Sequence, residues 1–527
     1  MQVTVRDADW GTMRPTVRRA DVREDADGFT VDLDAVHGDD AFTWRGTIRG
    51  SADGSLDFEM EGVAERDLLY RRIGICVLHP WEAYVGARFA ATGSSRGTSG
   101  TFPQEMVPQP LVGGEYRAMI PAFEHLEVAF PGGTVANFAF EGELEGWELE
   151  DQRNWTDASF KTYPTPLGLS HPRTLYRGER VRQRLRWQLA GPAPQDGNED
   201  GPVILRLGDP KGRVMPSLGI TAPQDAGVDP DRLASLGAAH MRVVLDVAGD
   251  LEDLRTAAST AGNAGLPLEV SFLLEDDEDG SRLRPAVEVL EGAPIARILV
   301  LRRSGATADG AFVTRIRPHL HRLGPRPIAG GTAAHFSELN RAAPDPATID
   351  AVALAMSPQV HEVDERSMLQ TLAIQEQIAE RVRALVADRD VIVSPVTLAV
   401  HDPSNPDDEI DERVGSAFGT AWTVGSACAL ASGGAAAVTL HERADRTVLA
   451  SAALSRAFRL LAARTGRELD SVGCSHPARV CALAAAGLPV LVANLTSEPV
   501  EIRLVGEVNV GGELAPYEVA ELERSPR

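Results

Sequence analysis

Eight short apolar segments between Met215 and Glu442 constrain the fold of this chain more than any other feature of its sequence. They alternate with amphipathic segments of roughly 10 to 15 residues, which is the pattern of repeated βα units in a parallel sheet. The predicted strands are residues 215–220, 241–247, 267–274, 296–302, 326–332, 351–357, 391–399 and 435–442. Because eight such units close a barrel, the sequence predicts a central (β/α)8 barrel of the TIM type.

The segments between these strands have the apolar spacing of helices. Residues 251–265 and 368–388 repeat apolar side chains at the spacing of one helical face. The first of these segments ends in Gly265, a residue type that is common at helix C-termini. Residues 447–465 follow the eighth strand, and we expect them to form the helix that completes the barrel.

Both ends of the chain alternate apolar and polar residues, as half-buried strands do. This alternation runs from Val17 to Gln188 and returns after Gly473. Residues 191–202, between the N-terminal region and the βα segments, are polar and rich in Pro and Gly, as in a linker. We predict three domains: an N-terminal β-rich, sandwich-like domain at 1–195, the catalytic barrel at 196–470 and a small C-terminal β-domain at 471–527.

The charge balance argues against nucleic-acid and membrane partners. Lys and Arg number 52 against 76 Asp and Glu, so the formal net charge is -24. Such a chain repels phosphate backbones and anionic lipid surfaces over a Debye length. The longest weakly polar run, residues 424–440, contains Ser and Gly and predicts a buried helix and strand instead of a membrane span.

Cysteine usage and the first residues of the chain indicate the cytoplasm. The four cysteines are scattered and include no CxxC pair, so we expect no disulfide framework and a reducing compartment. Charged residues interrupt every apolar stretch of residues 1–19, which leaves no hydrophobic region for a signal peptide. We therefore expect a cytoplasmic protein, and the sequence is compatible with a homo-oligomer.

Function in such a barrel collects where the strands end and the βα loops begin. Glu275 follows the third predicted strand and Glu442 ends the eighth, so two carboxyl groups can face one barrel mouth. A pair of this kind can divide into a proton donor and a base if the two environments separate their pKa values. The alternative is that both are ordinary loop carboxylates of an acidic protein.

Three further polar residues occupy the same predicted rim. His361 follows the sixth strand, where an imidazole can act as a base or an oxyanion donor, although it could equally be a structural histidine paired with Asp364. Asn340 follows the fifth strand and could bind sugar hydroxyls or cap a helix. Asp246 ends the second strand and could bind substrate, hold a neighbouring Arg or cap the next helix.

A second polar segment lies in the N-terminal region, at residues 147–166. It packs charges of both signs around an aromatic ring, which is costly to order unless the charges pair with one another or with a ligand. Trp155 offers a ring platform and Arg153 and Asp157 offer hydrogen bonds, a combination that suits a carbohydrate. A buried polar network between two domains would give the same pattern.

The sequence contains no motif that predicts a metal site. His441 and Glu442 begin the segment HERAD, which lacks the second His of a zinc protease, and no His, Cys and carboxylate cluster has zinc spacing. Residues 151–157 lack the central Gly and final Glu of a calcium loop. We therefore expect no metal and no cofactor.

Several segments resemble those of the D-apionate lactonase family, and together they cover almost the whole chain. The most specific is EDQRNWTDASFKTY at residues 150–163, preceded by GICVLHP at 74–80. The others are residues 330–341, 357–365, 393–398, 421–431, 436–442 and 490–504. The resemblance implies hydrolysis of D-apionolactone to D-apionate in apiose catabolism, and it assigns no catalytic residue.

Lactone hydrolysis needs an activated water and a hydrogen-bond donor for the oxyanion, and it needs neither a metal nor a redox cofactor. We expect Glu275 or Glu442 to act as the general base, with His361 and either Arg303 or Asn340 stabilising the oxyanion of a small sugar lactone.

Two other functions stay open from the sequence. A glycoside hydrolase usually places two carboxylates across the scissile bond, and the fourth and seventh predicted strands, 296–302 and 391–399, end without one. A carboxylate pair from the third and eighth strands could replace them. A non-catalytic carbohydrate-binding protein could instead use the N-terminal sheets.

Overall fold

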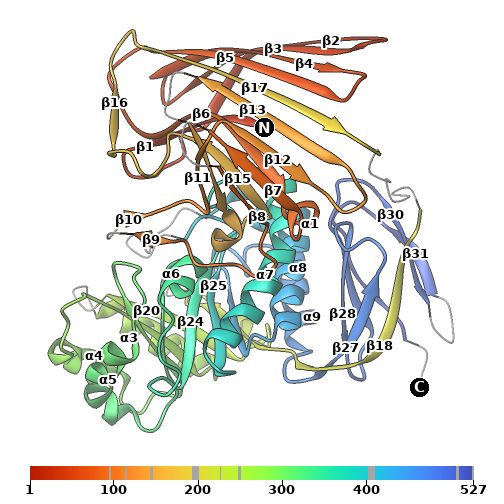
Figure 1. The fold of residues 1–527 in the computed structure, drawn as a ribbon. Helices are drawn as coiled ribbons and strands as arrows, with labels where there is room; N and C mark the ends of the chain where they lie inside the picture. The colour runs from red at the N-terminus through yellow and green to blue at the C-terminus, as the bar shows by residue number, and fades with distance from the viewer. Residues whose placement is uncertain are drawn as a thin grey trace. The chain divides into compact units, whose positions relative to one another are not determined.

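The computed structural model of this protein describes residues 1–93, 97–112, 115–142, 146–192, 201–225, 227–246, 251–401, 410–505 and 510–524. The chain divides into two units: the first comprises Met1–Arg153 and Ala158–Gly197, and the second comprises Asn154–Asp157 and Asn198–Arg527. The predicted first domain boundary near residue 195 lies outside the described residues. Figure 1 shows the fold, with many of its helices and strands labelled.

The second unit contains a closed barrel of eight parallel strands in consecutive order, as the sequence predicts. Pairing of the eighth strand with the first, from Ser217 beside Ala437 to Ile220 beside Leu440, closes the sheet. The strands are β19 (Ser217–Thr221), β20 (His240–Asp246), β21 (Leu268–Leu274), β22 (Ile295–Arg302), β23 (Ile328–Gly331), β24 (Ala351–Met356), β25 (Asp390–Val396) and β26 (Ala437–Leu440). The eight apolar segments formed strands because each is buried along nearly its whole length, as parallel strands covered on both faces must be.

A helix follows each barrel strand. These helices are α2 (Pro230–Ala234), α3 (Glu252–Ala264), α4 (Arg284–Leu290), α5 (Gly310–Ile316), α6 (Phe336–Arg341), α7 (Glu365–Leu385), α8 (Ala417–Gly433) and α9 (Ala452–Ala462). Short 3-10 helices accompany them at η2 (Ser281–Leu283), η3 (Arg317–Leu323) and η4 (Glu412–Gly415). Local signals set their ends: Gly265 ends α3 in the left-handed conformation, with φ 68°. Asp364 begins α7 by accepting a hydrogen bond from the Ser367 backbone N–H at 2.9 Å.

Helix α8 explains the weakly polar run in the sequence. Nearly every residue from Phe418 to Gly433 is buried, so this helix is apolar around its whole circumference. It packs against α7 and α9 and leads into β26. None of the helices in the described part of the chain has the length and apolar character that a bilayer crossing requires.

A buried ionic network lies inside the barrel, centred on Glu269 of β21. Its carboxylate accepts hydrogen bonds from Arg297 at 2.8 Å, from Thr439 at 3.0 Å and from Ser394. His240 lies 3.3 Å from the same carboxylate. Gly219 leaves room for this imidazole, because a Cβ there would lie 2.1 Å from His240 Nε2. The network satisfies a fully buried carboxylate, which would otherwise be very costly to bury.

The first unit is built from two antiparallel sheets around one apolar core, as the predicted sandwich requires. One sheet contains β1 (Gln2–Asp7), β6 (Leu68–Pro80), β15 (Ser159–Pro164), β14 (Trp147–Asp151), β11 (Ile120–Phe123) and β16 (Arg173–Leu175). The other contains β2 (Pro15–Asp25), β3 (Gly28–His37), β4 (Phe42–Ser51), β5 (Ser55–Ala64), β17 (Arg180–Ala190), β13 (Val135–Gly142), β12 (His125–Ala129), β7 (Arg88–Thr92) and β8 (Thr98–Thr101). A short pair, β9 (Leu111–Val112) with β10 (Glu115–Tyr116), and α1 (Trp81–Tyr84) and η1 (Gln152–Trp155) complete the elements before the barrel. Phe58 and Leu185 of one sheet and Ile73 and Ile75 of the other share the core.

The C-terminal strands form a sheet with one strand that precedes the barrel. Its order is β31 (Val510–Leu514), β30 (Val500–Val505), β18 (Val203–Val214), β27 (Glu468–Cys474), β28 (Val480–Ala485), β29 (Val490–Asn494) and β32 (Val519–Leu522). β18 pairs parallel with β30 and antiparallel with β27, and Figure 1 shows it in yellow beside these blue strands. The sequence groups residues 203–214 with the barrel, because alternation identifies a strand without identifying its partner.

We expect the stability of the barrel to fall as the pH is lowered from about 6.5 toward 4. Burial lowers the pKa of His240 from 6.5 to about 4, so the unfolded chain binds a proton more readily than the folded barrel across this window. The loss from His240 is at most on the order of 3 kcal/mol. Urea unfolding of wild type and His240→Gln at about pH 7.5 and about pH 5 measures this loss in the free energy of unfolding. The free energy should change less between the two pH values in the variant than in wild type.

His125→Gln serves as the matched control, because His125 is exposed on β12. It should retain the wild-type pH dependence. An equal pH dependence in His240→Gln and wild type would show that His240 contributes nothing to it.

Candidate active site

The barrel brings six of the predicted site residues to the carboxyl ends of its strands. Asp246, Glu275, Arg303, His361 and Glu442 end or follow barrel strands, and the sixth, Asn340, lies in α6 after β23. Residues Asn154–Asp157, which interrupt the first unit in sequence, belong to the second unit. The predicted residues Trp155 and Asp157 therefore also belong to the unit that contains the barrel.

Glu442 is held at this rim by an ion pair. Arg242 of β20 donates from one guanidinium nitrogen to both carboxylate oxygens, at 2.8 and 3.0 Å. The Glu442 side chain is only 12% exposed, and His401 Nδ1 lies 3.7 Å from its Oε1. Because the carboxylate is largely desolvated, its electrostatic interactions are stronger than they would be at the surface.

Glu442 also lines a small cavity of about 20 Å³. The other lining residues are Thr397, Leu398, Ala399, Val400, Ile410, Asp411, Val414, His441 and Thr447. These residues lie beyond β25 and β26, so the cavity is at the carboxyl ends of these two strands. Glutamate, aspartate, histidine and threonine residues are among those that line it.

His441, which precedes Glu442, is buried and tightly fixed. Its backbone has a left-handed φ of 61° and is bonded on both sides, through its N–H to Val396 O at 2.8 Å and through its carbonyl to Thr221 Oγ1 at 2.7 Å. Its Nε2 lies 2.8 Å from Thr423 Oγ1 of α8. Burial lowers the pKa of His441 to about 4, so the ring is neutral near pH 7. The sequence offered only its position beside Glu442 as a signal.

Asp411 braces the same region. It accepts hydrogen bonds from Arg413 at 2.9 and 2.7 Å and from Gln359, which follows β24, at 2.6 Å. Burial by itself raises the pKa of Asp411, but the hydrogen bonds from Arg413 and Gln359 outweigh burial and lower the pKa to about 2. Gln359 also donates to Leu398 O at 2.6 Å, which links the loop after β24 to the wall of the cavity. No sequence motif marked these residues.

His361 pairs with Asp157 through its Nδ1. The His361 side chain is 12% exposed and the Asp157 side chain 8%, so the contact is nearly desolvated. The ring of Trp155 lies edge-on to the imidazole, with centroids 6.0 Å apart. Asp364, the alternative partner expected from the sequence, instead caps α7. A carboxylate at Nδ1 fixes the orientation of the ring and stabilises a positive charge on it.

Residues 154–157 make two further contacts with α6. Asn340 Nδ2 donates to Asn154 Oδ1 at 2.8 Å, and both residues are buried. The Arg341 guanidinium lies over the Trp155 ring, 5.5 Å from its centroid. Thr156, which follows Trp155, adopts a left-handed φ of 76°, a conformation that costs energy for a β-branched residue. The segment is therefore held in place by specific contacts.

Glu275, Arg303 and Asp246 form a more exposed group at the rim. Arg303 Nε lies 2.9 Å from Glu275 Oε1, and its Nη2 contacts Asp246. The Glu275 side chain is 48% exposed, compared with 12% for Glu442. Glu275 is therefore better solvated than Glu442.

Arg153, which the sequence predicts as a substrate contact, is paired within the first unit. It is fully buried and donates to Asp151 at 2.8 and 2.7 Å and to the carbonyls of Pro103 and Gln104 at 2.9 and 3.0 Å. These bonds lie within the first unit and occupy the guanidinium. The sequence pattern could not distinguish this use of the charge from ligand binding, because both require pairing of the arginine.

Across the described ranges, no group of three His, Cys, Asp or Glu side chains gathers in an arrangement that could hold a metal ion. The groups named above can move protons and stabilise charge.

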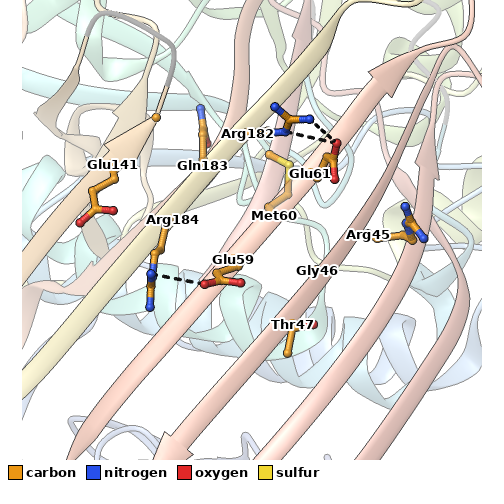
Figure 2. A pocket seen from close by; sticks show the side chains of 11 residues that line it. Arg45, Gly46, Thr47, Glu59, Met60, Glu61, Glu141, Arg182, Gln183 and Arg184 are labelled. Atoms are coloured by element: carbon orange, nitrogen blue, oxygen red, sulfur yellow. Dashed lines mark hydrogen bonds and ion pairs between the residues drawn. The ribbon is translucent and has the colours of Figure 1, made fainter.

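A larger hollow of about 590 Å³ lies on the nine-stranded sheet of the first unit. Figure 2 shows its charged lining: Arg182 approaches Glu61 at 3.1 Å and Arg184 approaches Glu59 at 3.4 Å. These side chains are between 37% and 57% exposed, so they are cross-strand ion pairs on a solvated sheet face. Exposed pairs contribute little energy, and we place the candidate chemistry at the barrel rim.

Comparison with known proteins identifies the family of both parts of the chain. Residues 1–192 match the model of the D-apionate lactonase N-terminal domain, and residues 218–454 match that of the D-apionate lactonase TIM barrel domain. The D-apionate lactonase of Brucella anthropi is 26% identical in an alignment covering 99% of this chain and 91% of the relative.

Two solved structures show a more distant likeness. A GH36 alpha-galactosidase from Geobacillus stearothermophilus covers 98% of this chain and 88% of its own at 10% identity, with a TM-score of 0.31. The match to a bifunctional glucanase-xylanase from a metagenome library covers 61% of this chain and 98% of that chain at 10% identity, with a TM-score of 0.44. Neither likeness carries an inference about activity. The two family models extend from the first strand into the last barrel helix, and the chain belongs to the D-apionate lactonase family.

Proposed function

We propose that this protein is a lactonase that hydrolyses D-apionolactone to D-apionate during the catabolism of apiose, in the cytoplasm. Family membership and the name of the Brucella anthropi relative support the reaction and its product. In this reaction water adds to the carbonyl carbon and the ring C–O bond breaks. The products are a carboxylic acid, which loses its proton to solvent, and a hydroxyl group.

One observation supports the barrel rim as the site of this chemistry. A desolvated carboxylate, Glu442, lines a cavity at the carboxyl ends of the strands, and an imidazole–carboxylate pair, His361 with Asp157, lies beyond the same strand ends. Lactone hydrolysis needs a base for water and a donor for the oxygen that becomes charged. These two sets of groups can supply both.

Glu442 is the better of the two candidate bases. It faces the cavity, whereas Glu275 is half exposed and shares Arg303 with Asp246. Arg242 keeps the Glu442 carboxylate in one orientation, so the base is positioned before substrate arrives. Glu442 then takes a proton from the water as the water attacks the carbonyl carbon.

His361 is the candidate donor. Asp157 stabilises positive charge on the imidazole, so the ring can donate a hydrogen bond to the oxyanion and then a proton to the departing ring oxygen. The proton taken by Glu442 returns to His361 through solvent, which restores both groups. Asn340, Arg303 and Trp155 remain our candidates for contacts with sugar hydroxyls and the sugar face.

A lactone panel tests the function directly. We expect purified protein to release acid from D-apionolactone, measured in a pH-stat, faster than from other four- and five-carbon aldonolactones. Aryl glycosides run in parallel should release no aglycone. Aglycone without acid would establish a glycosidase, and binding of sugars without either product would establish a carbohydrate-binding protein.

Replacing Glu442 by Gln should lower kcat for lactone hydrolysis by roughly 100-fold or more, because the amide cannot accept the proton of water. Steady-state kinetics measure this loss, and thermal unfolding shows whether the fold survives. Glu288→Gln is the matched control: Glu288 pairs with Arg284 on α4, is 47% exposed and should leave kcat unchanged. Near wild-type turnover of a folded Glu442→Gln enzyme would exclude this residue as the base.

Asp157→Asn should lower kcat on the order of 100-fold with little change in the melting temperature, because the amide no longer stabilises charge on His361. Asp364→Asn is a close comparison, since Asp364 lies three residues from His361 and caps α7. Asn is also a good cap, so this variant should keep both kcat and stability. Equal kcat in the two variants would refute a catalytic role for the Asp157–His361 pair.

A further inference from the structure

We infer that His441 is a second catalytic residue at this site, whose Nδ1 atom accepts a hydrogen bond from the water that attacks the lactone. The inference rests on the proposed lactonase function and adds a residue and an atom to it. Glu442 accepts one proton of the water and His441 holds the other, so a lone pair of the water oxygen is left to face the substrate.

The size of the cavity indicates what it holds. Its volume of about 20 Å³ is far too small for a sugar lactone. A single water needs roughly 10 to 15 Å³ of such space and several polar partners. His441, Glu442, Asp411, Thr397 and Thr447 supply polar groups around this space. The cavity therefore fits one ordered water at the catalytic end of the barrel.

The hydrogen bonds of α8 determine which nitrogen of His441 can accept. Thr423 Oγ1 donates its only proton to Gly419 O at 2.7 Å. We assign the hydroxyl proton to Gly419 O, so in its 2.8 Å contact with His441 Nε2 the hydroxyl accepts and Nε2 carries the ring proton. In the neutral ring this leaves Nδ1 as the acceptor.

The charge state of the ring agrees with this role. Burial lowers the pKa of His441 to about 4, so Nδ1 keeps its lone pair at neutral pH. Among the described residues, the charged and titratable groups around the cavity are Glu442 and Asp411 in its wall, Arg242 on Glu442, Arg413 on Asp411 and His401 beside Glu442. Each of the two wall carboxylates is paired with an arginine, which limits their effect on the ring.

The backbone of His441 supports a functional reading as well. A left-handed φ of 61° is uncommon for a residue with a side chain, and such conformations are concentrated at functional sites. Hydrogen bonds to Val396 and from Thr221 hold the residue in this conformation. These two hydrogen bonds therefore keep His441, a lining residue of the cavity, out of an extended backbone conformation.

The first test uses Thr423, which acts on the reaction only through His441. Thr423→Val leaves the buried Nε2–H without an acceptor, so the ring should shift its proton to Nδ1 and stop accepting from the water. We expect kcat to fall roughly 10-fold with KM unchanged, because an unsatisfied buried donor disfavours the original tautomer by about that factor. Thr423→Ser keeps the hydroxyl and should recover most of kcat.

Ser426→Ala is the matched control on the same helix. Ser426 is buried and donates to Gln375 at 2.5 Å, outside the cavity wall, so its loss tests the effect of removing a buried α8 hydroxyl. We expect unchanged kcat. The ¹⁵N shifts of His441, assigned by comparison with His441→Asn, should report the Nε2–H form in wild type and the Nδ1–H form in Thr423→Val.

A second pair of variants tests the imidazole itself. His441→Asn should retain part of kcat, because Asn tolerates the left-handed backbone and its amide oxygen can occupy the position of Nδ1. His441→Leu offers no acceptor and should lose roughly 100-fold. If His441→Leu does not fold, the Thr423 variants decide the question.

The outcomes separate the two proposals. No acid release by the wild-type protein would refute the lactonase function. Acid release by wild type together with an unchanged kcat in folded Thr423→Val or His441→Leu would overturn the role of His441 alone. Equal losses in Thr423→Val and Thr423→Ser would also overturn it, because the hydroxyl would then be irrelevant.

Discussion

The hydrogen-bonded pairing of β26 with β19 is the constraint on which the site depends, because it closes the barrel. In an open sheet the ends of the first and last strands would lie far apart. Closure brings Arg242, two residues after the start of β20, within 2.8 Å of Glu442, two residues after β26. Residues separated by 200 positions in sequence thereby form one ion pair. Backbone pairing between the first and last strands is therefore what brings these side chains together at this end of the barrel.

Glu269 and Glu442 are both desolvated carboxylates of the barrel, and their surroundings differ. Glu269 is fully buried and is bonded to an arginine and two hydroxyl groups. Glu442 has its own arginine, but it also borders a cavity that can admit a water. A satisfied carboxylate with no neighbouring space stabilises a unique fold, whereas one beside a small polar cavity can exchange protons with what enters it.

Helix α8 links the apolar interior to the proposed chemistry. It is buried around its circumference, so the position of Thr423 is fixed by packing on every side. Thr423 in turn fixes the tautomer of His441, and burial keeps that ring neutral. In our proposal, the position of the His441 ring toward the attacking water is therefore set by a helix of mostly small and apolar residues.

The sequence by itself determined the eight strands, three of the helical segments between them and the positions of Glu442 and His361 after their strands, because hydrophobic periodicity and the order of βα units are local properties of the chain. Pairing between distant residues was decided only by the tertiary structure. In the tertiary structure His361 pairs with Asp157 instead of Asp364, and Arg153 pairs with Asp151. β18 joins the C-terminal strands, and Thr423 contacts His441. Such partners depend on which side chains packing brings into one desolvated space, and no local pattern encodes that choice.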